Sequence, residues 1–256
     1  MKRILNKNKN IKIIYLITNM QKVYTITGKT DGFGAQYHAI MSGIAICKYK
    51  NYTYLHTPIK EVAHVKTIDE LNLNKFVGIK SEKNNKAIDI KEEFSYEVHT
   101  SKNPSIYYTK EVIDIIRNYY YSSDKPDIDN IDIAIHIRRG DVVKNTFGPG
   151  KVDRFTDNNF YKEVINKLLA KYPNYIIHIY SEGKVEDFSI KQHSSIRFHL
   201  NEDIIATFHS LVKARVLVMA KSSLSYSAGI LNENKVYYMD FWHKKLDHWI
   251  NIKDVN

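Results

Sequence analysis

Short apolar runs alternate with longer amphipathic stretches through the second half of the chain. Ile131–Ile137 (IDIAIHI), Tyr175–Tyr180 (YIIHIY) and Val216–Ala220 (VLVMA) are short and rich in β-branched, aromatic or other apolar residues, so they predict buried strands. Two further strands are predicted at Arg197–Leu200 and Val236–Asp240. Helices are predicted between these strands, from Thr156 or Asp157 to Tyr172, at Asp203–Ala214 and at Ser225–Leu231. Continuous apolar strands that alternate with helices are typical of a parallel, doubly wound sheet.

The first helix of this half has clear boundaries. Thr156 or Asp157 can cap its N-terminus, and Pro173 follows its end. Its buried face is predicted from apolar residues spaced by four, namely Phe160, Val164, Leu168 and Tyr172.

The first half of the chain alternates less regularly. Asp31-Gly32-Phe33-Gly34 predicts a turn that opens a helix over Gln36–Tyr49, and Thr109–Tyr121 predicts another helix. One face of the first helix would carry Tyr37, Ile40, Ile44 and Cys47. Candidate strands are Lys12–Ile17, Val23–Thr27 and Tyr52–His56, and Thr67–Glu70 fits a capping box.

The segment Ser122–Asn130 is polar and contains Pro126, so it is the best candidate for a domain boundary. We therefore predict an N-terminal α/β domain over residues 1–125 and a C-terminal Rossmann-like domain over residues 126–256. Residues around His243 and His248 predict an amphipathic C-terminal helix, which could pack back on the N-terminal domain.

Composition excludes several classes of protein. The 256 residues are 43% hydrophobic and 12% aromatic, which is enough for a globular core and excludes general disorder. No stretch approaches the ~20 apolar residues of a membrane span. The apolar run Ile11–Ile17 is short and contains Lys12, so we predict no signal peptide. The single cysteine, Cys47, excludes an intramolecular disulfide and a Cys-rich zinc module, and a reducing, cytoplasmic location is expected.

The net charge of +10 comes mostly from the N-terminal segment. Residues 1–30 contain seven Lys or Arg and no acid, whereas the rest of the chain is nearly balanced. A solvated basic flank explains this excess, and peripheral contact with an anionic membrane is the functional alternative. A nucleic-acid surface would need basic residues interleaved with stacking aromatics, and the sequence shows no such pattern, so no nucleic-acid partner is expected.

The predicted sheet implies a ligand site at the carboxyl ends of its strands, which is where open α/β sheets bind ligands. Three loops leave strands there: Arg138–Asp141, Ser181–Gly183 and Lys221–Ser225. In the first, two adjacent arginines could hold a diphosphate through their fork-shaped donors, with His136 and Arg138 on one face of the strand. Alternatively, one arginine could pair with Asp141 and close the sheet edge.

The other candidate motifs are weaker. Ser222, Ser223 and Ser225 open a helix, where backbone N–H groups and hydroxyls could bind an anion or simply cap the helix. A phosphate-binding loop with its lysine and a complete dinucleotide fingerprint are both absent from the sequence. Asp127-Ile128-Asp129 matches a metal-binding pattern but precedes a strand rather than following one, so no metal site is predicted.

Three motifs together resemble one family. His136-Ile137-Arg138-Arg139-Gly140-Asp141 resembles the His-x-Arg-Arg-x-Asp signature of the α-1,2-, α-1,6- and protein O-fucosyltransferases. Asp31–Gln36 (DGFGAQ) is similar to the Gly-x-Gly-x-Gln loop of that superfamily, and Ser222–Ser225 (SSLS) to its Ser-Ser-Phe-Ser segment. The motifs occur in the family's order across most of the chain.

The resemblance implies a GT-B fold, in which two Rossmann-like domains with parallel sheets face a cleft and the N-terminal domain lies on the acceptor side. It implies an inverting transfer of fucose from GDP-fucose to a glycan hydroxyl, with no metal and no other cofactor. Arg138 would hold the β-phosphate and stabilise the departing GDP, His136 would lie against the nucleotide, and Arg139 would support the turn or the phosphates. The other implied donor-binding residues are Gly34, Ala35, Gln36, Ser222, Ser223 and Ser225.

Two roles in the family pattern are open in this sequence. Relatives often place an acid before the Ser-Ser segment to bind the guanine, and the candidates here are Asp203 and Thr207, while Arg215 stands where relatives commonly have an acid. No carboxylate follows in the Lys144–Gly150 loop, which leaves Asp141 and Asp153 as candidates for the catalytic base. The missing base motivates an alternative, a non-catalytic nucleotide- or glycan-binding module on the same fold.

Overall fold

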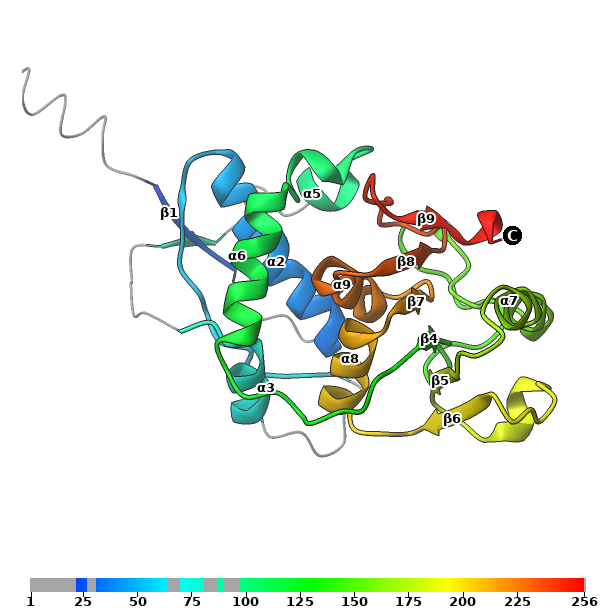
Figure 1. The fold of residues 1–256 in the computed structure, drawn as a ribbon. Coiled ribbons are helices and arrows are strands. Elements are labelled where there is room, and N and C mark those ends of the chain that lie inside the picture. Colours follow the sequence, from blue (N-terminus) through cyan, green and yellow to red (C-terminus); the bar gives the residue numbers. More distant parts are fainter. Residues whose placement is uncertain (1–21, 27–30, 64–69, 81–86, 90–96, 256) are drawn as a thin grey trace, which may run out of the picture.

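The computed structural model describes residues 22–26, 31–63, 70–80, 87–89 and 97–255 (Figure 1). Three expectations lie wholly or mostly outside these residues. They are the strand Lys12–Ile17, the basic N-terminal segment with its membrane contact, and the start of the capping box at Thr67. Within the described residues, no helix is long and apolar enough to cross a membrane.

The second half of the chain forms a parallel six-stranded sheet in the order β6-β5-β4-β7-β8-β9. The five strands expected there are all present, and β9 is an addition. From β4, the chain first builds the sheet outward on one side and then returns to build the other side, so β4 and β7 flank a topological switch point. The strands are β4 Ile133–His136, β5 Ile177–Ser181, β6 Ile196–Leu200, β7 Val216–Val218, β8 Lys235–Tyr238 and β9 Ile250–Asn251.

Helices cover both faces of this sheet, as predicted for a doubly wound fold (Figure 1). Ile133 and Ile135 of β4 pack toward α7 (Asn158–Lys171), whereas Ala134 belongs to the core with α8 (Ile204–Lys213) and α9 (Ser223–Leu231). Alternate residues of a strand point to opposite faces, so the continuous apolar sequence of β4 buries both of them.

The buried face predicted for α7 is only partly correct. Its buried residues are Tyr161, Val164, Ile165 and Leu168, while Phe160 and Tyr172 are only partly buried. The buried side chains recur at i, i+3, i+4 and i+7, which follows the 3.6-residue turn more closely than a strict spacing of four.

The first half of the chain forms a parallel three-stranded sheet in the order β2-β1-β3. Its strands are β1 Val23–Thr25, β2 Thr53–Tyr54 and β3 Ile88–Asp89. The helices of this half are α2 Phe33–Tyr49, α3 Glu70–Val77, α5 Glu97–Thr100 and α6 Lys110–Tyr121. Short 3-10 helices lie at Pro104–Ile106, Pro149–Lys151, Val185–Phe188 and Ile252–Asp254.

Helix α2 is the central helix of the molecule. The sequence predicts a single apolar face for it, but nearly every side chain from Phe33 to Cys47 is buried, because α2 packs against β1, β2, α5, α6 and α9. A helix that is covered on all sides shows little amphipathic periodicity. This explains why one face alone was an incomplete prediction.

The start of α2 lies directly against the start of α9. A Cβ atom at Gly34 would overlap the backbone of Leu224, so glycine is what allows the two helix N-termini to meet. Further along, Ser227 Oγ donates to the Gly34 carbonyl at 3.3 Å. These contacts join the two halves of the chain next to the carboxyl edge of the larger sheet.

The predicted C-terminal helix is wrong. Residues 241–255 form turns, β9 and a 3-10 helix. Phe241, Leu246 and Trp249 are all buried, and side chains take the place of helical hydrogen bonds, since Tyr226 and Tyr238 donate to the carbonyls of Lys244 and His243. The segment nevertheless reaches the first half, where Asp247 N donates to Ser105 Oγ at 2.9 Å. The domain boundary within residues 122–130 stays a prediction.

We predict that Gly34→Ala lowers the free energy of unfolding by about 1–3 kcal/mol, the usual cost of overpacking, because the added methyl must separate α2 from α9. Chemical denaturation measures the change. Gly229→Ala is the matched control within α9, where the new methyl would contact Met219 Cε and the Trp249 ring at 3.0 and 3.1 Å. Since a methionine end is mobile and alanine favours a helix, this control should cost less. Equal losses in the two variants would contradict the close contact at Gly34.

Candidate active site

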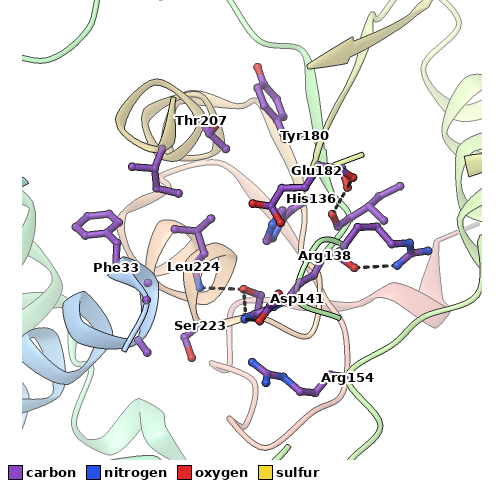
Figure 2. A pocket seen from close by; sticks show the side chains of 18 of the residues that line it. Phe33, His136, Arg138, Asp141, Arg154, Tyr180, Glu182, Thr207, Ser223 and Leu224 are labelled. Atoms are coloured by element: carbon purple, nitrogen blue, oxygen red, sulfur yellow. Dashed lines mark hydrogen bonds and ion pairs between the residues drawn. The ribbon is translucent and has the colours of Figure 1, made fainter. Parts of the chain in front are cut away.

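A pocket of about 920 Å³ lies at the carboxyl edge of the larger sheet, against the start of α2 (Figure 2). The loops that follow β4, β5, β6 and β7 all contribute to its wall, so the pocket lies at the edge where the topology predicts a ligand site. The residues from these loops include His136–Arg139, Asp141, Tyr180–Glu182, Asn201–Ile204 and Ser222–Leu224. The turn before α2 and the start of that helix add Asp31–Ala35.

Arg138 spans the switch point between β4 and β7. Its Nη2 and Nε donate to the two carboxylate oxygens of Asp141 at 2.7 and 3.2 Å, and its Nη1 donates to Ser222 Oγ at 3.2 Å. The ion pair is about three-quarters buried, since the Arg138 and Asp141 side chains are 22% and 23% exposed. The guanidinium is therefore held in one orientation at the pocket wall. The alternative in which an arginine pairs with Asp141 is realised by Arg138.

Arg139 contacts other partners than Arg138 does. Its guanidinium donates to the carbonyls of Arg138 and Thr156 at 2.8 Å each and to Asn158 Oδ1 at 2.7 Å, and it lies over the Phe155 ring. These bonds tie the turn after β4 to the start of α7. Although Arg139 touches the pocket wall, its donors are occupied by the turn.

His136 contributes a buried neutral imidazole to the pocket (Figure 2). It is 7% exposed, and its Nδ1 atom has no hydrogen-bond partner among the described residues. Burial and the Arg138 charge lower the pKa of His136 from 6.5 to about 3, with Asp141 opposing the shift. A buried polar atom without a partner at a pocket wall is suited to a bound ligand.

The three serines of the Ser-Ser-Leu-Ser segment have different roles. Ser222 caps α9 by accepting from Leu224 N at 3.2 Å and also accepts from Arg138. Ser225 is completely buried behind the wall, bonded to the backbone of Ala220, and is not a pocket residue. Only Ser222 and Ser223 line the pocket.

The hydrogen-bond direction at Ser223 follows from its neighbours. Trp242 Nε1, which can only donate, reaches His243 Nε2 at 3.0 Å, so this nitrogen must be an acceptor. Ser223 Oγ lies 3.1 Å from the same nitrogen and therefore donates to it. The oxygen lone pairs of Ser223 are what remains for a ligand, and they suit a hydroxyl donor.

The residues of the Asp31–Gln36 segment also have different roles. Gly34 and Ala35 line the pocket at the first turn of α2, whose N-cap, Gly32, offers no side-chain acceptor to the helix. The Ala35 N–H donates to the Gly32 carbonyl at 3.1 Å, so its expected role as a donor to a diphosphate is not supported. The N–H groups before it, of Phe33 and Gly34, lack a capping side chain and can serve an anion. Gln36 lies behind them and donates to the carbonyls of Asp31 and Glu61, so it holds the loop in place.

The carboxylates proposed from the sequence are mostly engaged elsewhere. Asp203 lines the pocket, but its Oδ1 accepts from Ile205 N and Ala206 N at 2.9 and 3.0 Å as the cap of α8. Asp153 does not line the pocket, and its Oδ1 accepts from Phe155 N. Arg215 forms an ion pair with Asp132, away from the pocket.

Some pocket residues were not singled out from the sequence. Glu182 lies in the Ser181–Gly183 loop that was expected at the site, although no role was predicted for it. Glu202 lies two residues after β6, so the rule that placed Arg138 at the sheet edge applies to it as well. Glu202 Oε1 lies 2.9 Å from His199 Nδ1. Arg154 and Trp242 come from a hairpin and a C-terminal turn, and no local pattern places them at the pocket.

Thr207 lines the pocket, whereas Asp127 and Asp129 are exposed in the linker. Among the described residues, no group of three or more His, Cys, Asp or Glu side chains could hold a metal ion.

A parallel, doubly wound sheet with a pocket at its switch point, together with a second parallel sheet in the first half of the chain, is the architecture of the GT-B class. Residues 92–247, more than half of the chain, match the profile of glycosyl transferase family 11. The chain belongs to this family and is a nucleotide-sugar-dependent glycosyltransferase.

Solved structures with a similar fold include two fucosyltransferases and a heptosyltransferase. E. coli heptosyltransferase WaaC with ADP has 11% identity and a TM-score of 0.45, over 90% of this chain and 92% of that one. POFUT1 in complex with GDP-fucose has 11% identity and a TM-score of 0.44, over 90% and 97%. Fucosyltransferase NodZ from Bradyrhizobium has 10% identity and a TM-score of 0.42, over 88% and 97%. No curated protein sequence matches the chain significantly.

We predict that His136 makes folding stability sensitive to acid. Because its pKa is lower in the folded protein, the unfolded chain binds the proton first, and stability falls as the pH drops from 6.5 toward 3. Relative to His136→Asn, the wild type should lose about 3 kcal/mol between pH 6.5 and 4, at roughly 1.4 kcal/mol for each pH unit. Urea unfolding at several pH values measures this difference, with exposed His193→Gln as the control. Parallel pH curves for wild type and His136→Asn would contradict a buried neutral imidazole.

Proposed function

We propose that the protein transfers fucose from GDP-fucose to a glycan hydroxyl, with inversion and without a metal. The observation that carries this proposal is the Arg138 guanidinium, which is fixed at the switch point of the sheet by Asp141 and Ser222. The identity of the donor sugar and base rests on the resemblance of His136–Asp141, Asp31–Gln36 and Ser222–Ser225 to the fucosyltransferase motifs. GDP-fucose is the donor substrate, and no further cofactor is proposed.

The proposed mechanism follows the charges that develop during transfer. When the bond between the sugar C1 and the phosphate oxygen breaks, positive charge grows on the sugar and negative charge on the leaving diphosphate. A fixed guanidinium in a partly buried pocket stabilises that negative charge without reorganising, which is the role that a divalent cation has in other transferases. The N-termini of α2 and α9 add partial positive charge on the same side.

Asp141 is proposed to orient Arg138 rather than to accept a proton. Both of its carboxylate oxygens accept hydrogen bonds from Arg138, which makes Asp141 a weaker base for the hydroxyl of the acceptor glycan. Asp31 and Glu182 are the further pocket carboxylates close to the switch point, and we propose that the acceptor proton passes to one of them.

The nucleotide is proposed to extend along the start of α8, where Glu202, Asp203 and Thr207 line the pocket. Asp203 is occupied as the helix cap, so Glu202 is the better-placed carboxylate for the guanine N–H groups. His199 holds Glu202 in position through its Nδ1 atom. The Nε2 atom of His199 lies in turn 2.9 Å from His178 Nδ1. Ser223 can accept from a sugar hydroxyl, since its own proton is directed at His243.

The first test combines ligand binding with transfer. GDP should raise the melting temperature more than UDP, CMP or dTDP, because a ligand that binds the folded state stabilises it. Arg138→Ala should reduce transfer from GDP-fucose at least 100-fold, in line with the loss of one fixed donor to a developing charge. Exposed Arg197→Ala is the control for removing an arginine.

Near wild-type turnover in Arg138→Ala would disprove the mechanism. Binding of GDP without any product from GDP-fucose, over a broad panel of acceptor glycans, would favour the alternative of a non-catalytic binding module.

The second test concerns the metal. Because Arg138 and two helix N-termini supply the positive charge, transfer should persist at its full rate in excess EDTA. The rate is measured before and after chelation, and again after Mn²⁺ or Mg²⁺ is added back. A rate that disappears with EDTA and returns with Mn²⁺ would replace this mechanism with a metal-dependent one.

A further inference from the structure

A hairpin between β4 and α7 brings a second arginine to the pocket. Phe147 and Asp153 form an antiparallel bridge, Gly148 N donates to the Val152 carbonyl, and Arg154 N donates to the Thr146 carbonyl, both at 2.8 Å. Lys221, just before α9, donates its Nζ to the Asp153 carbonyl at 2.8 Å. The backbone next to Arg154 is therefore held from both sides, and its side chain enters the pocket near Asp141 and Ser223 (Figure 2).

Trp242 provides a platform for this arginine. The Arg154 Cζ atom lies 5.6 Å from the centre of the Trp242 ring, within the range of a cation–π contact. Gly148 packs closely against the same ring, since a Cβ there would lie 2.7 Å from Trp242 Cζ3 and 3.3 Å from Arg154 Cγ. The indole nitrogen is bonded to His243, which sets the plane of the ring. The Trp242 ring thus limits the directions that the Arg154 side chain can take.

The contacts of the pocket arginines single out Arg154 as the one with a donor left for an anionic ligand. Of the described residues that line the pocket, three are arginines, and five are carboxylates, namely Asp31, Asp141, Glu182, Glu202 and Asp203. Arg139 donates to the turn after β4, and Arg138 is paired with Asp141. In contrast, the buried Nε of Arg154 has no hydrogen-bond partner in the part of the chain that the structure describes. Burial and the nearby Arg138 charge lower the pKa of Arg154, and Asp141 and Asp31 only partly oppose this. Two arginines that repel each other across one pocket are stabilised when a ligand places negative charge between them.

We propose that Arg154 is the second phosphate-binding arginine of the site, so that Arg138 holds one phosphoryl group of a nucleoside diphosphate and Arg154 holds the other. This inference rests on the proposed function, because it takes the donor to be a nucleoside diphosphate sugar. In this proposal the Trp242 ring, against which Gly148 packs, orients the Arg154 guanidinium toward the phosphate. Arg154 then shares with Arg138 the negative charge of the leaving diphosphate.

The experiment is titration calorimetry of wild type, Arg154→Met and Arg138→Met with guanosine, GMP, GDP and inorganic pyrophosphate. Arg154→Met should weaken GDP and pyrophosphate at least tenfold and leave guanosine unchanged, because only the phosphate contact is lost. Trp242→Phe should weaken GDP by a smaller factor, since the smaller ring leaves the guanidinium less well oriented. Lys144→Met, an exposed residue in the same connection, is the matched control for the loss of one positive charge. Circular dichroism and melting temperature confirm that each variant folds.

The outcomes separate this inference from the proposed function. If wild type prefers another nucleoside diphosphate to GDP, the donor assignment fails, and the same series with that nucleotide still decides the role of Arg154. Equal affinities of wild type and Arg154→Met for pyrophosphate and for the preferred nucleoside diphosphate would overturn the inference. So would a pocket that binds no diphosphate at all, or an Arg154→Met enzyme in which only the KM for the acceptor glycan rises.

Discussion

The contact between Arg138, Asp141 and Ser222 is the interaction on which the site depends. It joins the loop after β4 to the first turn of α9, which follows β7, and so it bridges the one place where the strand order of the sheet reverses. At such a switch point the loops on either side diverge and leave room for a ligand. The ion pair holds a positive charge at that opening in a defined orientation, which is more useful for catalysis than a mobile lysine would be.

Close packing behind the pocket keeps this arrangement rigid. Gly34 lets the N-terminus of α2 touch that of α9, and both helix ends then face the same space. Buried aromatic side chains surround the contact, and His136 stays uncharged because a second positive charge beside Arg138 would be costly to bury. The pocket therefore combines arginines held in place, several carboxylates and a neutral imidazole.

Neighbouring polar residues in the same motifs have different tasks, and local sequence does not separate them. Arg138 faces the pocket while Arg139 binds the turn, and Glu202 contacts His199 while Asp203 caps a helix. Ser223 lines the pocket, whereas Ser225, two residues later, is completely buried. In each pair the residue types are the same or similar, and the difference arises from which face of a strand or helix each one occupies and from what packs there.

The sequence by itself determined the alternation of strands and helices, the parallel sheet and the edge at which the site lies, because each of these follows from local periodicity and from the carboxyl ends of the strands. It also selected His136, Arg138 and Ser222, whose motifs are short and continuous. Only the tertiary structure decided that α2 is buried on all sides, that the C-terminal segment is not a helix, and that Arg154 and Trp242 join the pocket. These features depend on contacts between residues far apart in the chain, and the free energy of such contacts is absent from any short stretch of sequence.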